Sequence, residues 1–493
     1  MVFQQFLAID LGAESGRGVL SSFDGERISL SELGRFPTGR GADDLCPDGV
    51  QRWDFERIFA EIRALVDRAR DEANGDLAGV GVDSWGVDFG LVDSSDALIE
   101  SPVCYRDLSH PAAMTAAHAR IAREEIWDAT GIQHMSFNTL YQLVALRDRD
   151  PALLEKADRL LMMSDLLHAQ LMGTKGAGVE RTNGSTTQMM TPGAKAWNTQ
   201  LLERLNLPHH FLPEIVDAGT RLGVTTNGIP VFTPPTHDTA AAVAAAPART
   251  GTRWAFLSSG TWSLLGAELP APIIDRRAMA AGFSNEGGVG GTTRFLKNIM
   301  GLWLVQQSRR SLARETGKEY SYPELVSLAV AAPEGGPLID AVDERFLNPQ
   351  DMALEIRSAC RETGQPEPVD AGSLIRCCLE SLALAYRRSL RDLGALLGSN
   401  FDVLHIIGGG SQNTLLNQWT ADACGVTVLA GPSEATAVGN ALGQLVGAGA
   451  ISGWEQAREV SRRSFVPDVY KPNVAANERW ADREEQILKI WRG

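Results

Sequence analysis

Two stretches of the sequence share a pattern that suits phosphate binding. One is FLAIDLGAESGRGVL, from Phe6 to Leu20, and the other is WAFLSSGTWSLLGAEL, from Trp254 to Leu269. Each predicts a strand, a tight turn of small and hydroxylated residues, and a second strand. Backbone N–H groups in such a turn can approach phosphate oxygens closely, and hydroxyls add donors. Gly and Ser also dominate ordinary turns, so each copy alone fits a plain hairpin as well. The repetition favours two turns that hold one polyphosphate from both sides.

Only the first of these hairpins carries an acid. Asp10 ends its first strand, where a carboxylate could hold Mg²⁺ directly or through water. Arg17 could offer a phosphate a charged fork, although it equally fits a solvated surface side chain. In the second hairpin Leu257 and Ser258 occupy the matching place. That copy would therefore bind phosphate through its backbone and Thr261.

A candidate general base lies between the two hairpins. His237, Asp238 and Thr239 follow a predicted strand and open the Ala-rich helix TAAAVAAA. Unpaired N–H groups at a helix start favour negative charge, and side chains there project toward a ligand. Asp238 fits a helix N-cap. It equally fits the carboxylate that phosphoryl transfer to an alcohol needs to orient the hydroxyl and accept its proton, and its position favours this second interpretation.

Two further segments indicate ligand contacts. VGVDSWGVDFGLV places Asp83, Trp85, Gly86 and Asp88 on a pair of strands. An aromatic ring beside carboxylates or a bare glycine suits a sugar, although a buried Trp in a short hairpin is equally ordinary. In LHIIGGGSQN a strand enters three glycines, against which a flat adenine ring could lie. The segment lacks the third glycine of a dinucleotide fingerprint, and the chain has no GKS or GKT P-loop.

The elements that must position these residues alternate between strands and helices. The first part predicts a sheet with a helix packed on it, a mainly helical stretch from Ala112 to Met172, and a break at Thr182 to Thr187. The second part repeats this logic. The predicted strands are Phe6 to Leu11, Gly18 to Ser22, Gly79 to Asp83, Gly86 to Val92, IPVFTPP, the pair within Trp254 to Leu269, and VLHIIGG. The predicted helices are Phe55 to Glu72, Gly301 to Glu315, Ala371 to Leu397 and one from about Asn413. The domain boundary is placed near Pro247, which gives domains 1–247 and 248–493.

Composition limits the class of protein. The 493 residues are 44% hydrophobic and 22% charged, which is typical of a globular chain. The net charge of −15 disfavours a nucleic acid partner but is compatible with one small polyphosphate. Six scattered cysteines without a CxxC pair predict reduced thiols. No apolar run approaches the roughly 18 residues of a membrane span, and MVFQQFLAID lacks a signal peptide's basic region. The sequence therefore predicts a cytoplasmic protein with no membrane partner.

The motifs, taken in order, resemble a known family. IDLGAESGR, WGVDF, YRD, HDT, LSSGTWSL and IIGGGSQN are similar to motifs of the FGGY carbohydrate kinases, from about Phe6 to past Gly443. The resemblance implies an α/β fold of two actin-like (ribonuclease H-like) ATPase domains with a cleft between them. FNTLYQL, NEGG and LKNIMGLWL more narrowly resemble rhamnulokinases, which phosphorylate the O1 hydroxyl of L-rhamnulose with MgATP. The implied cofactors are ATP and Mg²⁺, and the implied partner is a small sugar.

The resemblance also implies roles for individual residues. Asp238 becomes the catalytic base, and Asp10 becomes the metal-linked carboxylate. The sugar contacts are Gly86, His237, Asp238, Thr239 and Asn298. The nucleotide contacts are Ala13, Glu14, Ser15, Gly16, Arg17, Gly260, Thr261, Gln306, Gly409, Gly410 and Asn413.

One departure from the family pattern bears on the sugar. Relatives commonly carry an Arg two places after the Asp of YRD, whereas this chain reads YRDLSH, with Ser109 and His110. The alternatives are therefore a kinase for another ketose or polyol, such as L-fuculose, L-ribulose or D-xylulose, and a non-catalytic actin-like sugar sensor. A sensor could dispense with Asp238, so its presence favours an enzyme. Monomer and homodimer both stay open.

Overall fold

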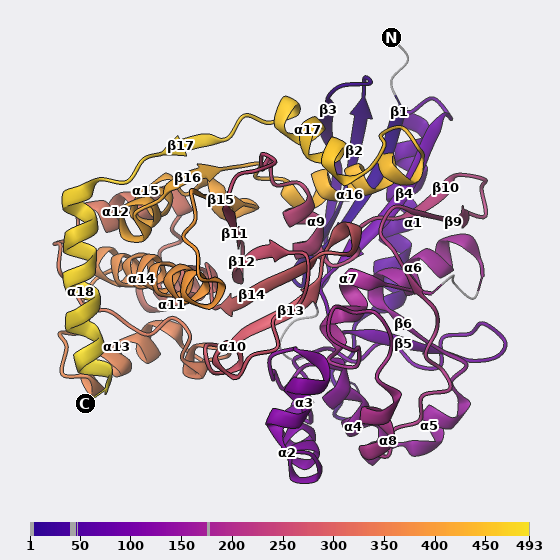
Figure 1. Cartoon of the computed structure of the whole chain (residues 1–493), viewed down its shortest axis with the longest axis horizontal. Helices are drawn as coiled ribbons and strands as arrows, with labels where there is room; N and C mark the ends of the chain where they lie inside the picture. The colour runs from indigo at the N-terminus through magenta and orange to yellow at the C-terminus, as the bar shows by residue number, and fades with distance from the viewer. Residues whose placement is uncertain (1–3, 40–45, 47, 175–177, 493) are drawn as a thin grey trace. The chain divides into compact units, whose positions relative to one another are not determined.

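The fold consists of two compact units that share the chain in alternating segments. The computed structural model describes residues 4–39, 46, 48–174 and 178–492 (Figure 1). The first unit comprises Met1–Pro247, Glu268–Phe295 and Glu434–Phe465, and the second comprises Ala248–Ala267, Leu296–Ser433 and Val466–Gly493. The sequence-based division at Pro247 coincides with the end of the first segment. The two later returns to the first unit follow from packing between residues far apart in the sequence, which no local pattern reveals.

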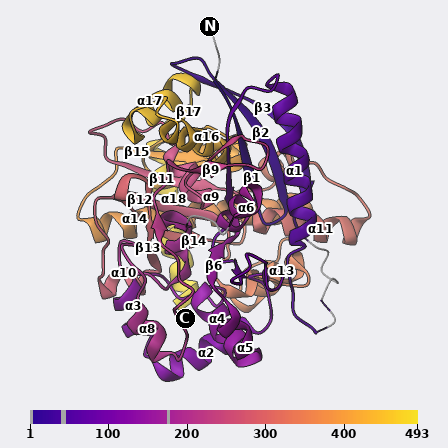
Figure 2. The same cartoon turned by 90° about the vertical axis from the view of Figure 1, so that its right-hand side faces the viewer.

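The first unit is built on a six-stranded sheet in the order β3-β2-β1-β4-β10-β9. Its strands are β1 (Gln4–Leu11), β2 (Ser15–Phe23), β3 (Ile28–Pro37), β4 (Leu77–Ser84), β9 (Thr220–Val224) and β10 (Pro230–Thr233). Helix α1 (Phe55–Glu72) lies against β2 and β3 and buries an apolar face (Figure 2). The first predicted hairpin is confirmed as β1 and β2, while β3 was not predicted.

The rest of this unit's first segment is mainly helical, as predicted. The helices are α2 (His110–Arg120), α3 (Arg123–Thr130), α4 (Thr139–Arg149), α5 (Pro151–Lys156), α6 (Met163–Met172) and α8 (Thr199–Arg204). Two small sheets accompany them, formed by β5 (Phe89–Val92) with β6 (Arg159–Met162) and by β7 (Val179–Glu180) with β8 (Ile215–Val216). These elements surround their own apolar core.

The predicted break at Thr182 to Thr187 is wrong. These residues form α7 (Arg181–Gly184) and a 3₁₀ turn (Ser185–Thr187). The hydroxyls of Ser185, Thr186 and Thr187 donate to backbone carbonyls three residues earlier, at 2.6–2.7 Å. Side chains that usually compete with helix formation here satisfy the backbone of a buried turn, since all three residues are buried.

Later segments complete the first unit. They contribute α10 (Arg276–Ala280), β13 (Phe283–Gly287), α16 (Ala435–Gly447) and α17 (Trp454–Ser464). Helix α16 packs against α9 (Asp238–Ala244) so closely that a Cβ atom at Gly439 would lie 1.8 Å from the carbonyl oxygen of Ala241. On the same helix the Asn440 side chain donates to Asp83, and Gln444 donates to the carbonyl of Leu7. This helix therefore connects β1, β4 and the start of α9.

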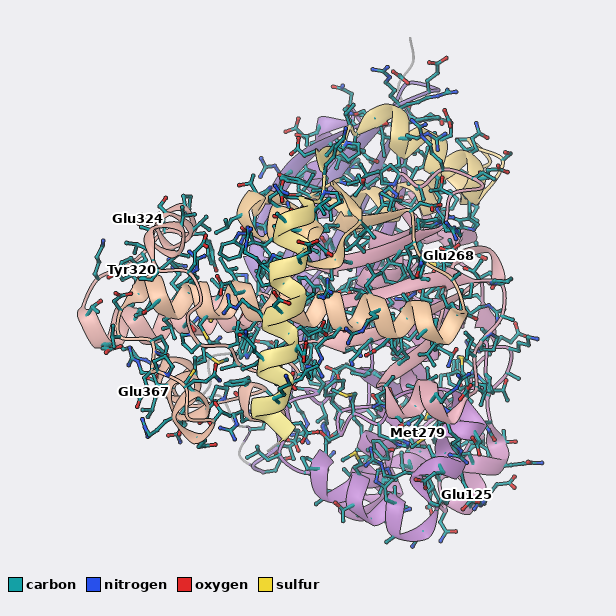
Figure 3. The ribbon with its side chains drawn as sticks, turned by 60° about the vertical axis from the view of Figure 1, so that its left-hand side comes forward. Glu125, Glu268, Met279, Tyr320, Glu324 and Glu367 are labelled. Carbon is teal, nitrogen blue, oxygen red and sulfur yellow. The ribbon has the colours of Figure 1, made fainter. Side chains whose placement is uncertain are left out.

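The second unit holds most residues of the strands that follow one another in the order β14-β12-β11-β15-β16-β17. They are β11 (Trp254–Ser259), β12 (Ser263–Leu269), β14 (Thr293–Ile299), β15 (Val403–Ile407), β16 (Thr427–Ala430) and β17 (Asp468–Tyr470). The end of β12, from Glu268, and the start of β14, up to Phe295, belong to the first unit. The helices include α11 (Trp303–Thr316), α12 (Tyr322–Ala331), α13 (Met352–Glu362), α14 (Ala371–Leu397), α15 (Thr414–Cys424) and α18 (Val474–Arg492). Figure 3 shows α18 crossing α14, where Glu484 accepts hydrogen bonds from Arg387 and Arg391. The predicted second hairpin and the helix from Ala371 to Leu397 are confirmed.

Replacing Gly439 by alanine should destabilise the protein. Alanine normally stabilises a helix relative to glycine, but here the added methyl group would meet the backbone of Ala241. Overpacking of this kind costs about 2 kcal/mol. A Gly439→Ala variant should melt at a lower temperature by differential scanning calorimetry. Gly336→Ala is the control, because a Cβ atom there meets no heavy atom within 4 Å. Equal melting temperatures for both variants would contradict the close approach.

Candidate functional site

Acidic side chains meet at the centre of the first unit's sheet. Asp10 on β1 lies opposite Arg17 on β2 and opposite Asp83 on β4. Arg17 donates to Oδ2 of Asp10 from Nε at 3.0 Å and from Nη2 at 2.7 Å, and it also forms an ion pair with Glu434. Burial disfavours the charge on Arg17, but Asp10 and Glu434 outweigh burial and raise its pKa. The predicted phosphate-binding cation is thus held between two carboxylates.

Asp83 belongs to the segment that the sequence pattern associates with a sugar. It is fully buried, and its Oδ2 accepts a hydrogen bond of 2.6 Å from Nδ2 of Asn440. Among the described residues, Oδ1 has no hydrogen-bond partner. Burial, and then repulsion by Asp10 and Asp238, raise the pKa of Asp83 well above its usual value. The carboxylates of Asp10, Asp83 and Asp238 therefore act on one another.

Asp238 is the first residue of α9, and the N-cap position belongs to His237. Its Oδ1 accepts hydrogen bonds from the backbone N–H of Thr239 at 2.5 Å and from the Thr239 hydroxyl at 3.2 Å. Burial raises the pKa of Asp238, with Asp10 adding to the rise and His237 opposing it. The side chain is 33% exposed, so the carboxylate can be reached. An accessible carboxylate with a raised pKa suits a general base.

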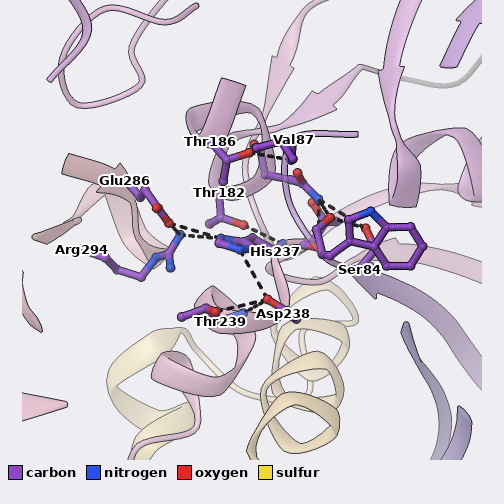
Figure 4. Close-up of polar contacts among 12 residues, drawn as sticks. Ser84, Val87, Thr182, Thr186, His237, Asp238, Thr239, Glu286 and Arg294 are labelled. Carbon is purple, nitrogen blue, oxygen red and sulfur yellow. Dashed lines mark hydrogen bonds and ion pairs between the residues drawn. The ribbon is translucent and has the colours of Figure 1, made fainter. Parts of the chain in front are cut away.

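His237 connects Asp238 to a buried ion pair (Figure 4). Its Nε2 lies 3.4 Å from Oδ1 of Asp238. On the other side of the ring, Nδ1 lies 3.0 Å from Nη2 of Arg294 and 3.4 Å from Oε2 of Glu286. Arg294 and Glu286 are themselves 3.0 Å apart. Three predicted site residues, His237, Asp238 and Thr239, are thus together with two charged residues to which the sequence gave no role.

Gly86 and Trp85 have structural roles in this unit. A Cβ atom on Gly86 would lie 3.0 Å from the side chain of Thr186. Trp85 is buried, lies 4.2 Å from the Trp53 ring, and donates to Asp88 from its indole nitrogen. Burial raises the pKa of Asp88 to about 6, opposed by the two indole donors. The sequence left open whether Trp85 contacts a sugar or is an ordinary buried side chain, and the structure favours the buried side chain.

Residues 12–14 connect β1 to β2, and Ser15 and Gly16 begin β2. The backbone N–H of Gly12 donates to the carbonyl of Ser15 at 3.0 Å, and the Thr38 hydroxyl donates to the carbonyl of Gly12 at 2.6 Å. A Cβ atom on Gly16 would lie 2.5 Å from the ring of Phe36. Close packing therefore requires the glycine at position 16, independently of any ligand.

The second unit holds the other hairpin and its neighbours. The carbonyls of Gly260 and Thr261 accept hydrogen bonds of 3.0 Å from the backbone N–H groups of Leu302 and Trp303. This ties the turn to the start of α11, the helix that carries Gln306. Among the described residues, Oε1 of Gln306 is buried without a hydrogen-bond partner. Asn298, predicted as a sugar contact, lies half-buried on β14 in this unit.

The glycines that follow β15 differ in how much room they leave for a side chain or a ligand. A Cβ atom on Gly410 would lie 2.0 Å from the Ser259 hydroxyl, so packing on β11 excludes any side chain there. Gly409 is exposed, and a Cβ atom there would meet no heavy atom within 4 Å. Asn413 is the N-cap of α15 and accepts from the backbone N–H of Leu416 at 3.0 Å. Of Gly409, Gly410 and Asn413, Gly409 is therefore the residue whose backbone a flat ring can approach.

Two models of one protein family match successive parts of the chain. The family model for the N-terminal domain of the FGGY family of carbohydrate kinases matches residues 5–233, and the model for its C-terminal domain matches residues 255–448. The chain belongs to the FGGY family of carbohydrate kinases, which transfer a phosphoryl group to an alcohol.

Three relatives cover nearly the whole chain. A rhamnulokinase from Bacteroides thetaiotaomicron is 41% identical and aligns over 96% of this chain and 97% of its own. Rhamnulokinases from Enterococcus faecalis (39% identical, over 95% of this chain and 94% of its own) and Pectobacterium atrosepticum (40% identical, over 97% and 95%) are similar to it as well.

Solved structures support the fold. The ligand-bound xylulose kinase from Lactobacillus acidophilus is 13% identical with a TM-score of 0.78, covering 99% of this chain and 97% of that one. Plasmodium falciparum glycerol kinase with ADP is 14% identical with the same TM-score, covering 99% and 98%. The implied mixed α/β fold of two actin-like domains is therefore confirmed. Within the described residues, the search for a helix that could cross a membrane finds none.

Sequence reasoning missed several charged or polar residues of the site. Glu286 is the acid of the NEGG motif, which contributed to the resemblance without a role for that acid, and Arg294 follows the motif on β14. Glu434 and Asn440 lie on or before α16, far along the chain from Asp10 and Asp83. A charged residue within an otherwise buried strand pattern is the signal that could have identified Arg294, which is 1% exposed.

Alanine substitutions at the two adjacent glycines should separate ligand binding from packing. Gly409→Ala should leave the melting temperature unchanged and weaken ADP binding, measured by isothermal titration calorimetry, because the methyl group occupies the open side of the backbone. Gly410→Ala should lower the melting temperature, because its methyl group collides with Ser259. Unchanged ADP affinity in Gly409→Ala would remove Gly409 from the nucleotide contacts.

Proposed function

We propose that this chain transfers the γ-phosphate of ATP to the O1 hydroxyl of L-rhamnulose, giving L-rhamnulose 1-phosphate and ADP. The observation that carries the proposal is the identity of 39–41% to three rhamnulokinases over nearly the whole chain. The site supplies the required chemistry, because Asp238 is an accessible carboxylate whose pKa is raised by burial.

Asp238 acts as the general base in this proposal. As the O1 oxygen attacks the γ-phosphorus in line, its O–H bond breaks and the proton passes to the Asp238 carboxylate. The bond between the γ-phosphorus and the bridging oxygen of ATP breaks, and ADP leaves with that electron pair. A raised pKa helps the carboxylate to hold the proton, because acid and base are then better matched.

The acidic cluster fits a magnesium ion. Asp83 keeps one buried carboxylate oxygen without a hydrogen-bond partner among the described residues, and its charge is destabilised by Asp10. A cation beside these acids would relieve that repulsion. In the described part of the chain, no group of three or more acidic, His or Cys side chains is arranged to hold a metal. When bound, Mg²⁺ neutralises phosphate charge. Asp10 would hold it directly or through water.

The nucleotide and sugar contacts stay predictions with a sharper physical basis. Gly260, Thr261 and Gln306 belong to one connected region of the second unit, and Gly409 offers an open backbone. Gly410 and Asn413 would act indirectly, by packing and by capping α15. In the first hairpin, Arg17 would have to share its guanidinium between a phosphate and its two carboxylate partners. For the sugar we propose Gly86, His237, Thr239 and Asn298. A cytoplasmic location stays a prediction.

A panel of ketoses tests the substrate. L-Rhamnulose should give the highest kcat/KM with MgATP in a coupled ADP-release assay, ahead of L-fuculose, L-ribulose and D-xylulose. The panel matters because Ser109 and His110 replace the usual family pattern, and both side chains bond within their own loop, to Asp107 and to the carbonyl of Tyr105. A higher kcat/KM for another ketose would reassign the substrate within the family.

Asp238→Asn should abolish sugar phosphorylation and preserve nucleotide affinity. The amide keeps the shape of the carboxylate but cannot take the proton, so kcat should fall at least about a hundredfold. ADP binding by calorimetry should stay within about twofold, because Asp238 is not among the proposed nucleotide contacts. Near-normal turnover would show that another group is the base.

A further inference from the structure

We propose that the buried pair of Arg294 and Glu286 fixes the proton of His237 on Nε2, so that His237 donates to Oδ1 of Asp238 and leaves Oδ2 to accept the substrate proton. Arg294 and Glu286 are thus positioning residues that act through His237. This inference rests on the proposed role of Asp238 as the base, and it assigns to each oxygen of that carboxylate a separate task.

The guanidinium of Arg294 is held in a fixed place. Its Nε donates to the carbonyl of Gly287 at 2.8 Å, and its Nη2 lies 3.0 Å from Oε2 of Glu286. The residue is 1% exposed. Glu180, Asp238 and Glu268 add attraction from neighbouring segments. Burial alone would raise the pKa of Glu286, but Arg294 and His237 outweigh burial and lower it, so Glu286 stays a carboxylate beside Arg294.

Arg294 determines which nitrogen of His237 carries the proton. A guanidinium can only donate hydrogen bonds. Because Nη2 of Arg294 lies 3.0 Å from Nδ1 of His237, Nδ1 must accept and therefore carries a lone pair. The Glu286 oxygen is farther from Nδ1, at 3.4 Å, and already faces Arg294. A neutral imidazole with an unprotonated Nδ1 carries its proton on Nε2.

On the Nε2 side of the ring, His237 contacts Asp238. The distance from Nε2 to Oδ1 is 3.4 Å, and the same Oδ1 accepts from the backbone and hydroxyl of Thr239. Within the described part of the chain, no hydrogen bond or ion pair engages Oδ2. The two oxygens therefore differ: Oδ1 is saturated by donors, and Oδ2 retains its lone pairs. The oxygen that takes the substrate proton is Oδ2.

The backbone of His237 is anchored separately from its ring. Its N–H donates to the hydroxyl of Thr182 at 3.2 Å, and that hydroxyl donates to the buried carboxylate of Glu180. Glu180 also accepts from the N–H of Thr236 at 3.0 Å and from its hydroxyl at 2.9 Å. The main chain is thus held from the α7 side, while Arg294 and Glu286 act on the imidazole ring. Changes at Arg294 can alter the ring without releasing the loop.

Nitrogen NMR of the full-length protein tests the tautomer without any substrate. The chain has eight histidines, and loss of one signal set in His237→Gln assigns His237 in a ¹⁵N-histidine-labelled sample. The wild-type spectrum should show a neutral ring protonated on Nε2. Arg294→Lys should move proton population to Nδ1, because the lysine lacks the planar guanidinium whose Nε is fixed on the Gly287 carbonyl while Nη2 reaches Nδ1. A wild-type ring protonated on Nδ1, or an unchanged tautomer in Arg294→Lys, would overturn the proposal.

Kinetics test whether the tautomer matters for catalysis. Arg294→Lys should lower kcat about tenfold, as loss of a hydrogen bond to a charged group does, with KM for ketose and ATP within about twofold. In a His237→Gln background, where the amide nitrogen replaces Nε2 as donor, the same change should lower kcat less than about twofold. An equal loss in both backgrounds, or a change in KM alone, would reduce Arg294 to a structural residue.

Two further variants control for folding. Arg376→Lys is the matched control, since Arg376 is also buried and pairs with Glu380 at 2.6 Å in the second unit; it should leave kcat unchanged. If Arg294→Lys does not fold, Glu286→Gln, which keeps the side-chain shape, should leave the proton on Nε2, because Arg294 still donates to Nδ1, and a shift of the proton to Nδ1 there overturns the proposal. A Nε2 tautomer in a protein that phosphorylates no ketose would refute the proposed function and leave the His237 assignment intact.

Discussion

The contact on which the first unit depends is the approach of α16 to α9 without intervening side chains. Gly439, Gly443 and Gly447 lie one helical turn apart, and a Cβ atom on any of them would collide with Ala241, with Pro234 or with Phe232 and Gly219. Packing this close is available only to glycine. This packing holds α9, whose first residue is Asp238, against α16. In the sequence, α16 comes after most of the residues of the second unit. The position of the proposed base thus depends on residues near the end of the sequence.

Helix α16 also helps to offset the free-energy cost of burying acids in the sheet of the first unit. Burying a carboxylate without partners is costly, and Asp83 obtains its hydrogen bond from Asn440, while Asp10 obtains its partner from Arg17. Glu180 and Glu286 are similarly supported by hydroxyls and by Arg294. Each buried acid near Asp238 is therefore held by a specific donor. Asp83 and Glu180 each also keep one oxygen without a hydrogen-bond partner among the described residues, but those oxygens are buried. Asp238 differs because its side chain is 33% exposed, so its free oxygen can be reached.

Sequence reasoning succeeded where the determining pattern is local. The two hairpins and the helices from Phe55 to Glu72 and Ala371 to Leu397 follow from periodicity and turn residues, and the structure confirms them. It failed at Thr182 to Thr187, where hydroxyls that usually disfavour helices bond to their own backbone in a buried turn. The pairing of His237 with Arg294 joins residues from separate segments of the chain. No propensity or spacing in one sequence reports such a pairing.

Glycine was the most ambiguous signal, and the structure resolves it position by position. Gly16 and Gly410 are required because Phe36 and Ser259 leave no room for a side chain, whereas Gly409 is open. The likeness of the two hairpins therefore reflects packing as much as ligand binding. The two hairpins still differ in charge, because Asp10 in the first hairpin has no acidic counterpart beside Gly260 in the second. Because Asp83 and Asp238 also belong to the first unit, the residues that we propose for proton transfer and metal binding all lie there. The second hairpin has only backbone groups and a hydroxyl to offer a phosphate, and such neutral donors can hold it without competing for the proton.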